Sequence, residues 1–95
     1  MKLIKTDDPK AAVAQIIEQL QAGECADVSF RGLDLVLTPP LSDGAILVAR
    51  GADDSPSRTY QRFLRGANQQ FIESKLNMQN GDAAQVIELV LRSIL

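Results

Sequence analysis

The stretch DVSFRGLDLVLT, residues 27 to 38, decides the fold of this chain. Apolar residues occur at every second position on both sides of Arg31-Gly32, which is the period of a β-strand with two different faces. Arg31-Gly32 can turn the chain, so the stretch predicts two antiparallel strands joined as a hairpin. Pro39 and Pro40 end the second strand, because neither has an N–H to donate to a neighbouring strand.

Strands are also predicted on both sides of this hairpin. Downstream, Ser42-Asp43-Gly44 predicts a turn, and residues 45–49 (AILVA) are apolar at consecutive positions. Such a run is typical of a strand that is covered on both faces, one by helices and the other, we expect, by a partner. Upstream, residues 2–5 predict a short edge strand in which lysines flank two apolar residues.

The first helix is predicted over residues 9–22. Asp8 is a good N-cap, and Pro9 suits the first helical turn, where its missing N–H has no cost. Apolar residues follow at helical spacing and form one stripe. Gly23 is a natural stop for this helix.

Two more helices are predicted in the C-terminal part. Ser55 caps the second, which covers about residues 56–79 and ends at Asn80-Gly81. Asp82 caps the third, which keeps its apolar residues on one side to the C-terminus. The order β-α-β-β-β-α-α predicts an α+β fold for residues 1–95 as a single domain. In it, a small antiparallel sheet of three or four strands packs against helices.

Composition limits the class of protein. The chain has 95 residues, 45% of them hydrophobic, which fits one globular domain. Its single cysteine, Cys25, excludes an intramolecular disulfide and fits a reducing compartment. No apolar run approaches the about 20 residues of a membrane span, and the N-terminus lacks the apolar run of a signal peptide. We therefore expect a cytoplasmic protein without membrane contact, of cellular, phage or plasmid origin.

The sequence gives little support to catalysis. It contains no histidine, which excludes histidine-based triads and nearly all zinc sites. One cysteine cannot form a thiolate cage, and no glycine-rich phosphate loop is present. Asp7-Asp8 and Asp53-Asp54 are adjacent acids, which are typical of caps and turns. We therefore predict no catalytic residue, no cofactor and no metal site, and a protein that is not an enzyme.

Basic residues gather in residues 55–72. This window has three arginines and no acid, a charge of +3, whereas the rest of the chain carries −5. At about 100° per residue, the predicted second helix places them in a narrow arc opposite its aromatic residues. This arc is either a solvated face or a contact face for carboxylates or phosphates, for which the planar guanidinium is suited. Its members are Arg58, Arg62, Arg65 and Gln69.

The predicted helices also carry more apolar surface than one small sheet covers. Ile72 and Leu76 fall on the arginine side of the second helix, and Leu89 and Leu95 lie outside the main stripe of the third. Either the second and third helices pack against each other, or these four residues form a homodimer interface.

Two functions are compatible with these features. The first is a non-enzymatic protein–protein interaction module, such as an adaptor, chaperone-like subunit or inhibitor, that binds an acidic protein surface through Arg58, Arg62, Arg65 and Gln69. The alternative is a nucleic-acid-binding protein whose three arginines contact phosphates. The element order of residues 9–79 is similar in outline to the double-stranded-RNA-binding domain, in which the last helix lays basic residues across phosphates. That family's glycine-serine-lysine-lysine signature is absent here, and the acidity of the chain favours a protein partner.

Overall fold

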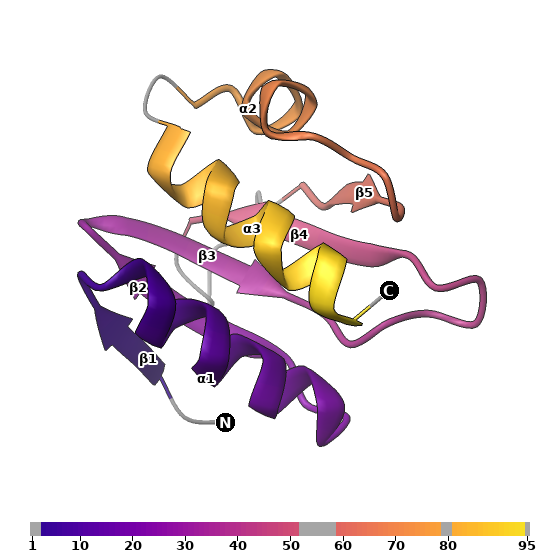
Figure 1. The fold of residues 1–95 in the computed structure, drawn as a ribbon, viewed down its shortest axis with the longest axis horizontal. Helices are drawn as coiled ribbons and strands as arrows, with labels where there is room; N and C mark the ends of the chain where they lie inside the picture. Colours follow the sequence, from indigo (N-terminus) through magenta and orange to yellow (C-terminus); the bar gives the residue numbers. More distant parts are fainter. Residues whose placement is uncertain (1–2, 52–58, 79–80, 95) are drawn as a thin grey trace.

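The structure is a computed structural model that describes residues 3–51, 59–78 and 81–94. In this part of the chain, five strands form one sheet and three helices accompany it (Figure 1). The predicted α+β class is confirmed, with one strand more than the three or four expected. The elements in chain order are β1 (Leu3–Thr6), α1 (Pro9–Gln21), β2 (Ala26–Phe30), β3 (Leu33–Leu37), β4 (Ile46–Arg50), β5 (Gln61–Phe63), α2 (Gln69–Leu76) and α3 (Gly81–Ile94).

The strands lie in the sheet in the order in which they occur in the chain, β1-β2-β3-β4-β5. The pairs from β2 onward are antiparallel, but β1 runs parallel to β2. The prediction of a purely antiparallel sheet is therefore wrong. The reason is that α1 carries the chain back along the sheet before β2 begins, as a helical crossover between parallel strands does.

The N-terminal half of the chain folds as its local sequence patterns predict. Asp8 caps α1, and its carboxylate accepts a hydrogen bond from the backbone N–H of Lys10 at 3.1 Å. In the hairpin, Phe30 pairs with Leu33 across a two-residue turn. Both turn residues have positive φ, 51° at Arg31 and 79° at Gly32, which is the conformation that matches the twist of the flanking strands.

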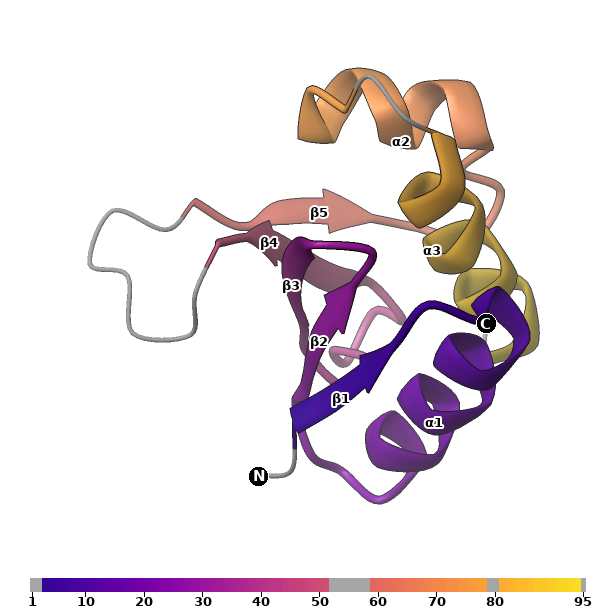
Figure 2. The ribbon, with the colours of Figure 1, turned by 90° about the vertical axis from the view of Figure 1, so that its left-hand side faces the viewer.

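The core lies on one face of the sheet. Helices α1 and α3 lie on the same side of the strands and pack against each other (Figure 2). Alternate strand residues, such as Val28, Leu35 and Val48, face them and are fully buried. Val36 and Ala49 pair across β3 and β4 on the other face, which no described helix covers, and they are buried as well. Most of β4 is therefore buried within the chain, whereas cover of its second face by a partner stays a prediction.

The predicted second helix, residues 56–79, is wrong over much of its described length. The chain forms β5 along β4, turns at Gly66, and only then starts α2. Gly66 has a φ of 96°, which an α-helix does not contain, and Asn68 caps the new helix by accepting from the N–H of Phe71 at 2.8 Å. Residues 56–58 and 79 of the predicted helix lie outside the described residues.

The end of α2 also comes earlier than predicted. Asn77 adopts the left-handed conformation, with φ 52°, and the N–H of Met78 donates to the carbonyl of Glu73 at 2.9 Å. This arrangement closes a helix C-terminus. Gly81 lies inside α3 and not at the end of α2, and Asp82 occupies the first turn of α3 and not its cap.

Candidate functional site

The four residues predicted to form a contact face do not share one helix. Arg58 lies outside the described residues. Arg62 lies on β5 and forms an ion pair with Asp43 of the β3–β4 connection. Arg65 is exposed in the turn after β5. Gln69 begins α2, and its Nε2 donates to the Glu73 carboxylate at 3.0 Å. The single helical face was wrong because β5 and the turn at Gly66 precede α2 where the helix was predicted, whereas a partner contact by each residue stays a prediction.

The predicted dimer residues are also in different surroundings. Ile72 is 0% and Leu76 is 5% exposed, and both belong to the core that α2 forms with α3. Packing of these two helices therefore accounts for them. Leu89 is 38% exposed on α3, and Leu95 lies outside the described residues. A homodimer stays a prediction, for which Leu89 is the accessible described residue.

Exposed apolar side chains are frequent in the segment that contains β5 and α2. In the described part of the chain, six large apolar residues are exposed, and three of them fall within residues 60–71. Tyr60 and Leu64 flank β5, and Phe71 lies on α2, which packs beside β5 at that end of the sheet (Figure 1). We define the β5–α2 surface as these three residues with Arg65 and Lys75.

Phe71 is held in place although its side chain is half exposed. Its ring meets the buried ring of Phe63 edge to face, with 6.1 Å between centroids and 88° between planes. The Nζ of Lys75 lies 5.6 Å from the centroid of the Phe71 ring. Both arrangements are favourable for aromatic rings. The chain therefore presents an oriented aromatic side chain to its surroundings, with a cation beside it.

The charge of the β5–α2 surface is positive. Arg65 and Lys75 are exposed, and none of the described carboxylates forms an ion pair with either. The acid nearest in sequence, Glu73, accepts a hydrogen bond from Gln69. Apolar and basic side chains thus occur together here on a chain of net charge −2.

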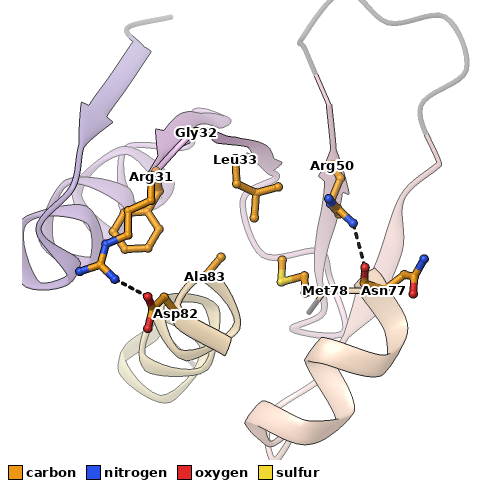
Figure 3. Close-up of a pocket in the computed structure, with 9 residues that line it drawn as sticks. Arg31, Gly32, Leu33, Arg50, Asn77, Met78, Asp82 and Ala83 are labelled. Atoms are coloured by element: carbon orange, nitrogen blue, oxygen red, sulfur yellow. Dashed lines mark hydrogen bonds and ion pairs between the residues drawn. The ribbon is translucent and has the colours of Figure 1, made fainter. Parts of the chain in front are cut away.

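A second feature is a hollow of about 440 Å³ at one end of the sheet. The β2–β3 turn, the end of β4, the end of α2 and the start of α3 converge on it (Figure 3). Arg31 lies on one side, in ion-pair contact with Asp82, and Arg50 lies on the other, bonded to the end of α2. Leu33 and Met78 lie between the two arginines in this view.

Sequence reasoning missed the hollow and both of its arginines. Arg31 was visible only as half of a turn, and Arg50 only as the residue after an apolar strand. They lie far from each other and from Asp82 in the sequence, so no local charge count brings them together. The β5–α2 surface, in contrast, had a visible signal: Gly66 followed by Asn68 is a break and then a helix cap.

The described residues show no group of three histidine, cysteine, aspartate or glutamate side chains able to hold a metal ion. None of the described helices is both long and apolar enough to cross a bilayer. Comparison of the chain with protein-family models, curated proteins and solved structures finds no match.

Proposed function

We propose that this chain is a small non-enzymatic protein–protein interaction module whose β5–α2 surface binds a partner. The observation that carries the proposal is the concentration of exposed apolar side chains at residues 60–71, beside two cations without a described carboxylate partner. We propose that the partner presents an acidic segment with apolar side chains.

The physical basis is the composition of stable protein interfaces. Their centres are enriched in aromatic residues and arginine, because these side chains bury a large area and still make directed contacts. Tyr60 and Phe71 are each a little over 40% exposed, so a partner has apolar area to bury on both. Arg65 and Lys75 would pair with acidic residues at the rim and steer the approach of the partner.

Two further observations support this function over the alternatives. The sequence has no histidine, and Cys25 has no second cysteine to work with, which supports a non-enzymatic role. The ion pair of Arg62 with Asp43 uses one of the arginines that were candidates for phosphate contact. Because Arg62 was equally a candidate for carboxylate contact, this ion pair does not separate the two partners, and it is the net charge of −2 that supports a protein partner over nucleic acid.

The location of the protein in the cell and its oligomeric state belong to the same proposal. We place the protein in the cytoplasm because a chain with one cysteine needs no oxidising compartment. A homodimer through Leu89 is compatible with the β5–α2 surface, because Leu89 lies on α3.

The test is selection of short random peptides displayed on phage against the immobilised protein. The proposal predicts enrichment of peptides that combine acidic and apolar residues. Phe71→Ser and Leu64→Ser should each weaken binding of the selected peptides by about tenfold or more. The matched control is Leu3→Ser, which changes an exposed leucine on β1, at the far edge of the sheet. Selected peptides that bind all three variants equally, or no enrichment, would contradict the proposal.

A further inference from the structure

We propose that the hollow at the end of the sheet is a binding site for a small organic carboxylate with an apolar body, and that Arg50 binds the carboxylate group. This site is separate from the β5–α2 surface and does not depend on the function proposed for it. Three observations carry the inference: the fixed position of Arg50, the charge balance of the lining, and the size and polarity of the hollow.

Arg50 is held by the end of α2. Its Nη1 donates to the carbonyl oxygens of Leu76 and Asn77, both at 3.0 Å. These carbonyls belong to the negative end of the helix, where a cation is favoured. A guanidinium has five N–H donors in one plane, so the hydrogen bonds of Nη1 fix the orientation of the others.

The remaining donors of Arg50 have no described acceptor. No hydrogen bond joins its Nε or Nη2 to any of the described residues, and no described carboxylate forms an ion pair with it. A guanidinium edge with two parallel N–H donors is the geometry that binds a carboxylate bidentately. Because Arg50 is already oriented, little side-chain entropy would be lost when such a group binds.

The opposite wall of the hollow is electrically balanced. Arg31 pairs with Asp82, its Nε donates to the backbone carbonyl of Asp7 at 3.2 Å, and its guanidinium lies over the ring of Phe30 at 5.2 Å. The charges of Arg31 and Asp82 cancel. Arg50 then gives the described lining one net positive charge, which matches a ligand with a single negative charge.

The rest of the lining is largely apolar. Phe30, Leu33, Met78 and Ala83 contribute to it, with Leu33 and Met78 between the two arginines (Figure 3). The volume of about 440 Å³ falls in the range of roughly 300 to 1,000 Å³ that small-molecule sites occupy. A ligand that is only an anion, such as phosphate, would make no apolar contact with these side chains. An apolar body attached to one carboxylate fits both parts of the lining.

The test is a titration followed by backbone amide NMR shifts, with phenylacetate as the probe and the neutral phenylacetamide as its matched control. The site predicts that phenylacetate shifts the amides of residues 30–33, 50, 77–78 and 82–83, and that phenylacetamide does not. Arg50→Gln should weaken binding by about tenfold or more, because it removes a charged hydrogen-bond donor. Arg92→Gln, on the exposed side of α3, should leave binding unchanged.

Two additions make the result decisive. If Arg50→Gln loosens the end of α2, Arg50→Lys keeps the charge without the planar fork, and it should still weaken binding. A peptide that ends in a free phenylalanine carboxylate, compared with its amidated form, distinguishes a protein C-terminus from a free acid as the source of the same chemistry. The proposal would be overturned by equal shifts with acid and amide, or by shifts outside the hollow. It would also be overturned by unchanged binding in Arg50→Lys, or by no response to either acid.

Discussion

Two regions of this molecule use their apolar residues in opposite ways. The layer formed by α1 and α3 on strands β1 to β4 keeps most of its large apolar side chains inside, and Phe30, Leu35 and Ile87 are at most 1% exposed, with Leu3 and Leu89 as the exposed exceptions. The region formed by β5 and α2 leaves Leu64 and Phe71 half exposed beside Arg65 and Lys75, neither of which forms an ion pair with a described carboxylate. We infer that the first region carries stability and that the second is free to carry recognition.

The difference follows from the lengths of the elements. Helices α1 and α3 have 13 and 14 residues, whereas β5 has three and α2 has eight. A helix as short as α2 is not stable alone, so its caps and its packing must hold it. Ile72 and Leu76 anchor it to the core, and four of its other residues remain exposed: Gln70, Phe71, Ser74 and Lys75. Substitutions in the two regions should therefore differ in what they change.

The largest effect is expected from Ile87→Ala in α3. Ile87 is 0% exposed, so the substitution removes buried methyl groups and leaves a cavity. The free energy of unfolding should fall by about 2 to 5 kcal/mol, measured by urea denaturation. Phe71→Ser, which removes a larger side chain from the half-exposed site, should cost less. The contrast between the two regions fails if Phe71→Ser is the more destabilising change.

Gly66→Ala should come next. Gly66 turns the chain between β5 and α2 with a φ of 96°, where a side chain costs about 1 to 2 kcal/mol. Gly23→Ala is a matched control, because Gly23 has a φ of 81° after α1 and both positions have open space around a new Cβ. Both variants should lose similar stability, but only Gly66→Ala should weaken binding of a peptide selected on the β5–α2 surface. If both variants bind the peptide equally, the turn at Gly66 does not determine the shape of the β5–α2 surface.

The helix caps give a smaller and equally matched pair. Asn68 accepts from the N–H of Phe71, and Asp8 accepts from the N–H of Lys10. Replacement of either by alanine should cost about 1 kcal/mol in thermal or urea unfolding. Only Asn68→Ala should change peptide affinity, because its helix carries Phe71. If Asp8→Ala also loses peptide affinity, the affinity follows the overall stability of the protein and not the position of Phe71.

The smallest effect on stability is expected from Arg62→Gln. The Arg62 and Asp43 side chains are about half exposed, and such ion pairs contribute less than about 0.5 kcal/mol. The free energy of unfolding should therefore hardly change, in low or high salt. A loss much greater than this would mean that the ion pair holds β5 in place.

The N-terminal half could be predicted from the sequence because each of its local signals agrees with the tertiary structure. Asp8-Pro9 begins a helix, Arg31-Gly32 turns a hairpin, and residues 45–49 form a buried strand. The parallel pairing of β1 with β2 was missed because only the alternation within each strand was used, although the predicted strand-helix-strand order is typical of parallel neighbours.

The prediction of one helix over residues 56–79 was wrong for a different physical reason. Its spacing of apolar residues also fits a helix, in which the aromatic residues share the face opposite the arginines. The pairing of residues 61–63 with β4 overrides that preference, and the chain turns at Gly66, where a helix would continue. The hollow could not be predicted, because Arg31, Arg50 and Asp82 line one hollow only once the sheet and helices are assembled.

The most direct test of the β5–α2 surface is site-specific photo-crosslinking in lysate of the source cells, with and without nuclease. A photo-reactive amino acid would replace Leu64 in one protein and Leu3 in another, and crosslinked species would be identified by mass spectrometry. The account predicts a protein that is crosslinked from position 64, survives nuclease and is absent from position 3. The same crosslinks from both positions, or crosslinks from position 64 that nuclease removes, would contradict it.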